Sequence, residues 1–315
     1  MISIIIPIFN RAHLITETIN SILAQTYTDW ECIIVDDWST DQTLEVLAQL
    51  THSDSRFKVY QRPKGLNKGP SACRNYGISK SSGTYIQFFD SDDVMHPKHL
   101  ELKMANIDTA DMIICKLMPF QEVFTETLYT KETDEVLKLY DNNFEAFATG
   151  HLEIMMVSPM WKRVVLEKFL PIREDLHLLE DHDLHARALF TGLTIKIINK
   201  SLIYYRRNTS STTTNFFKNL DTGLASYLEA KATVLKLSDS KKIKTAILKN
   251  ILGYFRMALA ARNIKAANTC LKYISLKNLD YNLLLQLKML RIRFFYAIFK
   301  IFKKGDTYFK PLFKI

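Results

Sequence analysis

The sequence predicts an α/β fold, a mostly parallel, Rossmann-like sheet with helices on both faces, followed by a basic helical extension. Within the first 90 residues, short apolar runs rich in β-branched residues alternate with stretches of helical spacing. Such runs are typical of strands that are buried on both faces of a sheet. Acidic clusters follow two of these runs, at 36–37 and 90–93. Alternating strands and helices imply crossover connections, which give a parallel sheet.

The elements follow one another in a regular order. The predicted strands are 3–8, 32–35, 57–60 and 85–89, and the predicted helices lie at 14–23, around 44–48 and at 70–78. Pro70 supports the last helix, because proline is favoured in the first turn. Polar residues follow the strands at Asn10, at 36–37 and at 90–93. Ligands of such sheets bind at the carboxyl ends of the strands, so we expect these residues to lie around one site.

The Asp-Ser-Asp-Asp motif at 90–93 is the strongest chemical signal in the chain. Like charges a few ångströms apart raise one another's pKa unless a metal or a basic group neutralises them. Hard oxygen ligands suit Mg²⁺ or Mn²⁺, and Mg²⁺ usually takes one or two protein carboxylates together with water and substrate phosphates. The motif therefore predicts a divalent cation bound with a nucleoside diphosphate. The alternative is a solvated turn that is closed near Pro97.

The segment 3–93 resembles the nucleotide-sugar domain of the family 2 glycosyltransferases, which are inverting enzymes with a GT-A fold. The matching pieces are PIFN at 7–10, SILAQT at 21–26, VDDWSTD at 35–41, GPSACRNYG at 69–77 and GTYIQFFDSDD at 83–93. Five ordered pieces at compatible spacing make the resemblance specific.

The resemblance implies a role for each of three carboxylates. It implies that Asp37 binds the nucleobase, Asp92 the ribose, and Asp93 the Mn²⁺ or Mg²⁺ that bridges the diphosphate. A carboxylate can accept the imide N–H of uracil or the hydroxyls of ribose, so a UDP-sugar is the expected donor. Pro7 and Gly69 are expected to bring backbone groups close to this donor.

Two further residues of the matching pieces, Arg74 and Trp38, have alternative interpretations. Arg74 lies in the predicted helix that comes after Gly69, where its guanidinium is expected to pair with Asp37 or with a phosphate oxygen. The alternative is an ordinary surface arginine. Trp38 stands where the family usually has glycine, which either remodels the rim around the base or shows that the turn needs no positive φ.

The acceptor half of the reaction requires a general base. The acidic segment 174–187, which reads EDHDL at 180–184, resembles the Glu-Asp-x-Asp-Leu segment of the family. The resemblance implies that Asp181 takes the proton of the acceptor hydroxyl. Such help is worth roughly 10²- to 10⁴-fold in rate. Glu180, Asp183 and His185 are the other candidates. The alternative is a surface helix without a catalytic role, whose acidic first turn interacts favourably with the helix dipole.

The segment 202–212 resembles the strand and loop that cover the diphosphate in the family. Arg206 or Arg207 is expected to stabilise the departing nucleotide. Asn208 stands where relatives often carry a histidine, and 209–215 is expected to be a lid or a plain linker. Trp161 could line the acceptor site, but core packing explains it equally well.

Composition suggests one large domain and a smaller appendage, since the chain has 315 residues and 47% hydrophobic content. We expect a GT-A domain at 1–215, with a nucleotide-sugar half at 1–100 and an acceptor half at 101–215, and a helical basic region at 216–315. The four cysteines show no paired spacing and are expected to be reduced in a cytoplasmic protein. The N-terminus enters a strand at once, so no signal peptide is expected.

Charge is distributed unevenly along the chain. Residues 241–315 hold 17 Lys and Arg against two acids, Asp280 and Asp306, whereas 1–240 hold the remaining 25 bases and 31 acids. The basic run with aromatic residues at 291–304 is too short to span a bilayer but suits an anionic membrane interface. The alternatives are packing on the catalytic domain or on a second subunit, which leaves a homo-oligomer open. Nucleic acid is not an expected partner, because the acidic body would repel it.

The sequence as a whole predicts an inverting glycosyltransferase, a metal-dependent hexosyltransferase that uses a UDP-sugar. Its expected acceptor is a glycan or lipid-linked glycan of the lipopolysaccharide or capsule type, at the inner face of the cell membrane. A nucleotidyltransferase is disfavoured, because the first predicted strand is not followed by a basic Gly-rich loop. The remaining alternative is a noncatalytic membrane-associated interaction protein with a degenerate sugar-nucleotide domain, which Trp38 and Asn208 keep open.

Overall fold

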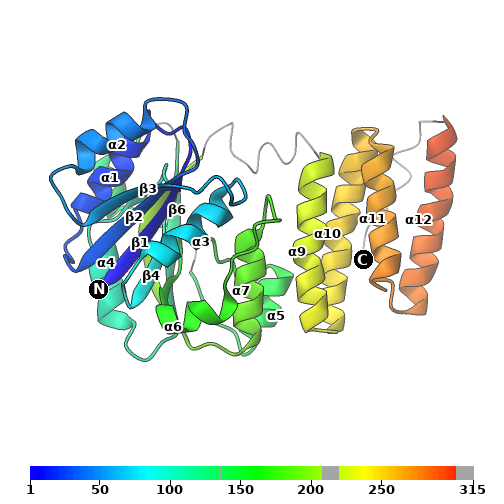
Figure 1. Cartoon of the computed structure of the whole chain (residues 1–315). Coiled ribbons are helices and arrows are strands. Elements are labelled where there is room, and N and C mark those ends of the chain that lie inside the picture. The colour runs from blue at the N-terminus through cyan, green and yellow to red at the C-terminus, as the bar shows by residue number, and fades with distance from the viewer. Residues whose placement is uncertain (122, 135, 208–219, 303–315) are drawn as a thin grey trace. The chain divides into compact units, whose positions relative to one another are not determined.

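A computed structural model describes residues 1–121, 123–134, 136–207 and 220–302, which divide into two compact units (Figure 1). The first unit consists of Met1–Phe144, Leu152–Asp175 and Glu180–Ser211. The second consists of Thr212–Ile315 with two short segments, Glu145–His151 and Leu176–Leu179. All of the predicted site residues belong to the first unit.

The first unit is built on an eight-stranded sheet with the order β3-β2-β1-β4-β7-β6-β8-β5. The strands are β1 Ile2–Ile8, β2 Trp30–Asp36, β3 Phe57–Gln61, β4 Tyr85–Phe88, β5 Val94–Met95, β6 Met112–Phe120, β7 Met160–Lys162 and β8 Ile195–Arg206. The pairs β3-β2, β2-β1, β1-β4 and β6-β8 are parallel. The short strands β7 and β5 pair antiparallel with their neighbours. The sheet is therefore mixed. Its parallel block β3-β2-β1-β4 is the one predicted from the first 90 residues, whereas the parallel pair β6-β8 lies later in the chain.

Helices lie around this sheet in the first unit (Figure 1). They are α1 Ile15–Leu23, α2 Thr43–Thr51, α3 Pro70–Lys80, α4 His99–Asn106, α6 Arg163–Leu166 and α7 Glu180–Phe190, with 3₁₀ turns at Glu126–Thr130 and Glu167–Phe169. The helix α5 Asn143–Thr149 begins in this unit, but its residues from Glu145 onward belong to the second unit. The prediction of an α/β fold is confirmed.

The strands β1 and β2 are buried and mostly apolar, as their sequence predicts, with Ser3, Glu31 and Asp36 as buried polar residues. Every residue of β1 and β2 is buried, because helices cover both faces of these strands. α3 approaches the sheet closely at Gly77, where an added Cβ would lie 2.6 Å from Cγ2 of Ile5. This close contact fixes α3 against the strands whose ends carry the acidic residues.

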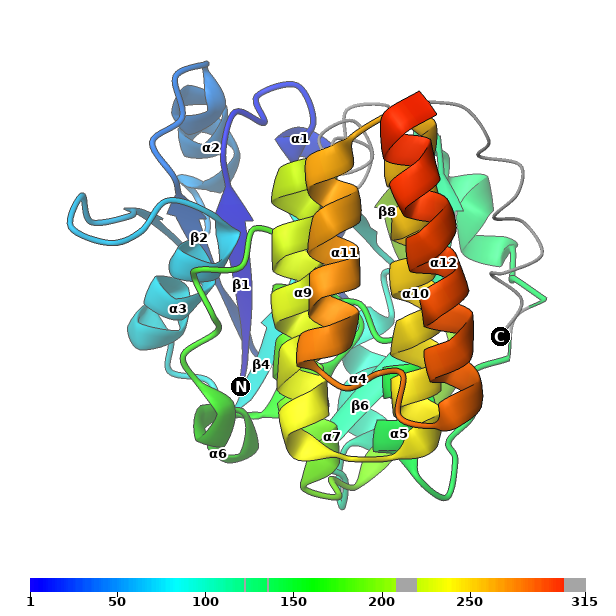
Figure 2. The same ribbon diagram turned by 90° about the vertical axis from the view of Figure 1, so that its right-hand side faces the viewer.

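The C-terminal helices form their own apolar core. They are α9 Leu220–Leu237, α10 Lys241–Ala260, α11 Ile264–Leu276 and α12 Leu283–Phe302, and Figure 2 shows them running alongside one another. Aromatic side chains tie them together: Tyr227 packs edge-on against Tyr254, and the Tyr273 hydroxyl donates to the Leu228 carbonyl over 2.8 Å. None of the helices in the described ranges is long and apolar enough to cross a membrane.

The cysteines also match their predicted state. Cys32, Cys73, Cys115 and Cys270 are all buried and unpaired with one another.

Candidate active site

The turn after β4 places three carboxylates at the edge where the parallel strands end. Asp93 is the deepest, with 5% of its surface exposed, and its Oδ1 accepts the backbone N–H of Arg206 over 3.1 Å. The hydroxyl of Thr18 donates to the Asp93 carbonyl over 2.8 Å. Arg11 lies nearer to Asp92, with Nε 3.6 Å from Oδ2. The carboxylate turn is thus held by elements that are far apart in sequence.

The raised pKa values of two carboxylates in this turn indicate that the turn would favour an additional positive charge. Burial, followed by the neighbouring charge of Asp90, raises the pKa of Asp92 above its usual range. The same causes, with the added charge of Asp92, raise the pKa of Asp93 still further. Protein cations nearby do not fully offset burial and repulsion at Asp92 and Asp93, so a bound cation would stabilise the ionised form of these two carboxylates.

Arg206 lies on the carboxylate turn, at the end of β8. Its Nε donates to the Asp92 carbonyl over 3.2 Å, and its Nη2 pairs with Glu17. Its guanidinium also covers the ring of Phe120, with 4.5 Å between the guanidinium carbon and the ring centroid. The predicted Arg206 is therefore part of the site, whereas Arg207 is exposed and donates to the Tyr205 hydroxyl.

The donor set of the turn fits a hard divalent cation. Among the described residues, no three His, Cys, Asp or Glu side chains gather into a ready-made metal cage. Mg²⁺ and Mn²⁺ do not need such a cage, because they bind through one or two carboxylates and complete their shell with water and substrate phosphates. Asp93 and Asp92 offer this kind of incomplete oxygen site.

The predicted base-binding carboxylate, Asp37, is held by two donors. Arg62 Nε donates to its Oδ1 over 2.5 Å, and the N–H of Gly69 donates to its Oδ2 over 2.9 Å. The backbone N–H of Asp37 donates to the carbonyl of Ile8, the residue after Pro7, over 2.8 Å. The structure thus brings Asp37 and Gly69 into contact and puts the end of β1 beside them.

Arg62 is a site residue that the sequence reasoning missed. Besides Asp37, its guanidinium reaches the carbonyls of Pro63 and Leu66, so that it organises the loop before α3. The only signal in the sequence is a single arginine two residues after the third predicted strand, and a signal of this kind is common on protein surfaces.

Trp38 occupies a left-handed backbone conformation, with φ 65°. The idea that this turn needs no positive φ is therefore wrong, and a tryptophan bears a strain that glycine would avoid. Its indole N–H donates to the Arg62 carbonyl over 2.9 Å, and the Lys64 ammonium lies 4.6 Å from the ring centroid. Trp38 thus joins the end of β2 to the loop that carries Arg62.

Arg74 connects two parts of the site instead of pairing with Asp37. Its side chain is 4% exposed, so it is not a surface arginine, and it reaches Asp90 over 2.8 Å and Glu180 over 3.0 Å. The partner expected from the sequence, Asp37, is taken by Arg62. The buried guanidinium therefore links the carboxylate turn to the first residue of α7.

Asp181, the predicted base, follows Glu180 at the start of α7. Its Oδ1 accepts the N–H of His182 over 2.7 Å. Burial, followed by the charge of Glu180, raises the pKa of Asp181 to about 7. A carboxylate with such a pKa can both take up and release a proton near neutral pH.

The other candidates for the general base, Asp183 and His185, are buried and already paired with or packed against neighbouring side chains. Asp183 is buried and pairs with Arg187 over 2.8 Å and with Arg173 over 3.6 Å. His185 stacks on Trp161, with 5.9 Å between ring centroids, and burial lowers its pKa to about 4. Trp161 itself is fully buried, which supports its role in the core. Asn208 and the expected lid at 209–215 lie outside the described residues.

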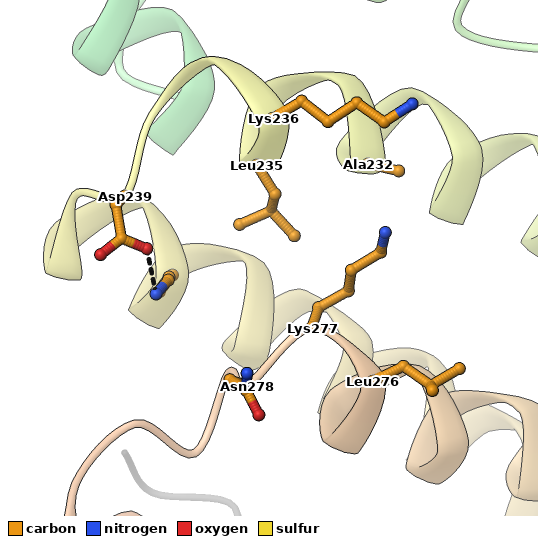
Figure 3. Close-up of a pocket in the computed structure, with 8 residues that line it drawn as sticks. Ala232, Leu235, Lys236, Asp239, Leu276, Lys277 and Asn278 are labelled. Atoms are coloured by element: carbon orange, nitrogen blue, oxygen red, sulfur yellow. Dashed lines mark ion pairs between the residues drawn. The ribbon is translucent and has the colours of Figure 1, made fainter.

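A pocket lies in the helical unit, and its lining lacks the cluster of carboxylates found at the turn after β4. It has a volume of about 230 Å³ and is lined by Ala232, Leu235, Lys236, Asp239, Lys244, Leu276, Lys277 and Asn278. Figure 3 shows Lys277 extending from the end of α11 toward α9, and the ion pair of Asp239 with Lys244. None of the predicted site residues lines this pocket.

Comparison with known sequences shows that the chain is similar to glycosyltransferases. Residues 3–165 match the sequence model of "Glycosyl transferase family 2". The putative glycosyltransferase EpsH of Bacillus subtilis is 29% identical over 244 residues, which cover 75% of this chain and 69% of EpsH. The glycosyltransferase GlyG of Streptococcus pneumoniae is 27% identical, over 67% of this chain and 72% of GlyG. An uncharacterized glycosyltransferase of Rickettsia felis is 30% identical, over 56% of this chain and 27% of that protein.

Comparison with solved structures supports the same fold. S. aureus TarS 1-349 in complex with UDP-GlcNAc superimposes with a TM-score of 0.58 at 18% identity, over 85% of this chain and 90% of TarS 1-349. The mannosyltransferase PcManGT of Pyrobaculum calidifontis, in complex with GDP-Man and Mn²⁺, gives a TM-score of 0.52 at 15% identity, over 96% and 88% of the two chains.

Proposed function

Because the chain belongs to glycosyl transferase family 2, we propose that it is an inverting, metal-dependent hexosyltransferase that uses a UDP-sugar. One observation carries this proposal. Arg74 pairs with both Asp90 in the carboxylate turn and Glu180 beside Asp181, so a cation and diphosphate site stands next to a base with a pKa of about 7. Sugar transfer from a nucleoside diphosphate needs these two parts together.

The donor is assigned to UDP by the carboxylate of Asp37. Arg62 and Gly69 hold this carboxylate in place, and it can still accept the imide N–H of uracil because an ionised carboxylate has several acceptor positions. The complex of TarS with UDP-GlcNAc supports this choice, whereas PcManGT binds GDP-Man on a similar fold. Asp92 is assigned to the ribose hydroxyls, and Pro7 and Gly69 to backbone contacts.

The diphosphate is assigned to the carboxylate turn. Asp93, with Asp92 beside it, would hold Mn²⁺ or Mg²⁺, which when bound offsets the charge that develops on the departing UDP. Arg206 lies at the same turn and contributes positive charge toward the phosphates. The presence of Mn²⁺ in the PcManGT complex supports the choice of metal.

The acceptor is activated by Asp181. This carboxylate takes the proton of the attacking hydroxyl while the hydroxyl oxygen displaces UDP from the anomeric carbon in a single step. The new glycosidic bond forms as the bond to UDP breaks, so the anomeric configuration inverts. Arg74 holds Glu180, and through it the start of α7, at a fixed distance from the donor site.

The acceptor is proposed to be a surface glycan of the lipopolysaccharide or capsule type, carried on a lipid at the inner face of the cell membrane. The strongly basic C-terminal region supports a peripheral association with an anionic membrane. A homo-oligomer built through the same region stays open.

The test is the slow release of UDP from a panel of UDP-sugars, with GDP-mannose as a comparison, in Mn²⁺ and in EDTA. We expect release from one UDP-sugar that requires Mn²⁺, and its loss by at least 10²-fold in Asp93→Ala and in Asp181→Asn. Turnover of GDP-mannose and of no UDP-sugar would overturn the assignment of uracil as the nucleobase of the donor. No binding or turnover of any nucleotide sugar would support the noncatalytic alternative.

Two matched variants control for general damage. Asp29→Ala removes an exposed carboxylate that lies just before β2 and pairs with the N-terminal ammonium group. Asp175→Asn neutralises an exposed carboxylate that lies just before α7 and pairs with Arg173. Both are expected to keep wild-type release of UDP.

A further inference from the structure

The last described helix, α12, has two opposed apolar faces. Its inner face packs within the helical unit and consists of Leu285, Met289, Ile292, Tyr296 and Phe299, each at most 5% exposed. Tyr296 also donates from its hydroxyl to Asn268 of α11 over 2.9 Å. The inner face therefore accounts for how α12 is held.

The outer face is also apolar, but its side chains are exposed among the described residues of the unit. It consists of Leu284, Leu287, Leu290, Phe294, Ile298 and Ile301, whose exposed fractions range from 37% to 74%. These six residues, the outer stripe, follow one another at intervals of three or four, so they lie along one side of the helix. A stripe of this length on the surface of a soluble unit indicates an interaction site.

The charges beside the outer stripe indicate what covers it. α12 carries Lys288, Arg291, Arg293 and Lys300 and no acidic residue. A second copy meeting the stripe face to face would bring these like charges together. An anionic lipid surface would pair with them while accepting the apolar side chains.

We propose that the outer stripe of α12 lies in the interface of an anionic membrane, with the flanking basic side chains among the headgroups. This deepens the proposed function, on which it rests, because it names the surface by which the enzyme reaches a lipid-linked acceptor. The aromatic residues Tyr296 and Phe299, part of the aromatic face expected to contact lipid, face inward instead.

The test is flotation of the full-length protein with vesicles of phosphatidylcholine alone or with 30% phosphatidylglycerol. We expect binding to the anionic vesicles only, weakened at high salt, because each basic residue contributes roughly fivefold to partitioning. The variant Leu287→Ser/Leu290→Ser/Phe294→Ser should lose at least tenfold in partitioning. Its exposed positions should leave the melting temperature within about 2 °C of wild type.

The matched control is Val123→Ser/Val136→Ser/Val164→Ser, which removes three equally exposed apolar side chains from the other unit. It should bind vesicles as the wild type does. Unchanged vesicle binding by the stripe variant would overturn the proposal. Conversion of an oligomer to a monomer by the stripe variant, without loss of vesicle binding, would overturn it in favour of a second copy.

The readouts separate this inference from the proposed function. Release of UDP in solution needs no vesicle, and flotation needs no turnover. The stripe variant should therefore release UDP at the wild-type rate, whereas Asp93→Ala should float with anionic vesicles as the wild type does.

Discussion

At the residue scale, Asp181 should give the enzyme a characteristic pH dependence. Its pKa is raised to about 7 by burial and by Glu180, and only the ionised form can accept a proton. Below this pH we expect kcat/KM for UDP release to fall about tenfold per pH unit, and above it to level off. A pH profile between 5 and 9 measures this directly.

Asp175→Asn serves as the control for this profile, because its carboxylate is exposed and belongs to the same acidic segment. It should leave the midpoint unchanged. A profile that is flat between pH 6 and 8 in the wild type would contradict the assignment of Asp181 as the base.

Trp38 should support donor binding at a cost in backbone strain. In Trp38→Gly, relief of the positive φ is worth roughly 1–2 kcal/mol, while loss of the indole contacts to Arg62 and Lys64 acts in the opposite direction. We therefore expect little change in melting temperature but roughly fivefold weaker binding of UDP, since a lost hydrogen bond of this kind is worth about 1 kcal/mol. Calorimetric titration with UDP and Mn²⁺ measures it.

The variant Trp38→Phe separates the two contributions. It keeps an aromatic ring next to Lys64 but removes the indole N–H, so its affinity should fall between wild type and Trp38→Gly. Equal affinity in all three proteins would show that the turn does not position Arg62.

At the scale of elements, Arg74 ties α3 to both the carboxylate turn and the start of α7. Lysine keeps the charge but cannot reach two carboxylates with a planar fork. In Arg74→Lys we expect kcat for UDP release to fall roughly 10²-fold, because small displacements of catalytic groups have effects of this size. In Arg74→Gln, which removes the charge, the midpoint of the pH profile should also rise, since the charge of Arg74 lowers the pKa of Asp181.

Arg173→Lys is the comparison for this variant, because Arg173 pairs with carboxylates near α7 but does not reach the turn after β4. It should keep the wild-type kcat and pH midpoint. An Arg74→Gln enzyme with an unshifted midpoint would contradict the coupling.

The parallel block of the sheet could be predicted because its signals are local. Strands such as β1 and β2 are short runs of β-branched residues, and the intervening helices carry a clear period. β7 could not be predicted, since three residues show no period, and its antiparallel place between β4 and β6 depends on contacts distant in sequence.

The candidate site was predictable only in part, for a similar reason. Asp93, Asp37 and Asp181 stand out because each lies in an acidic motif. Their partners do not: Arg62 and Glu17 reach the site from positions with no distinctive neighbours, and Arg74 takes Asp90 and Glu180 instead of Asp37. Which arginine meets which carboxylate is decided by the fold and not by local sequence.

At the scale of the whole molecule, ligand binding should stabilise one unit selectively. UDP with Mn²⁺ at about 100 times the dissociation constant adds roughly 2.7 kcal/mol to the unit that binds it, which corresponds to about 5–11 °C in melting temperature. We expect scanning calorimetry to show this shift for the sheet-containing unit and none for the helical unit. In Asp93→Ala, Mn²⁺ should add nothing to the effect of UDP.

Asp29→Ala is again the control and should show the wild-type shift. Equal stabilisation of both units would contradict a donor site confined to the first unit.

The two opposed faces of α12 also bear on how the enzyme would meet its acceptor. One face secures the helix to its unit, so the other is presented as a rigid strip and needs no folding on contact. An enzyme held to a bilayer in this way searches in two dimensions. Its rate would then follow the density of acceptor in the lipid plane, and adding inert lipid would slow it at constant total acceptor.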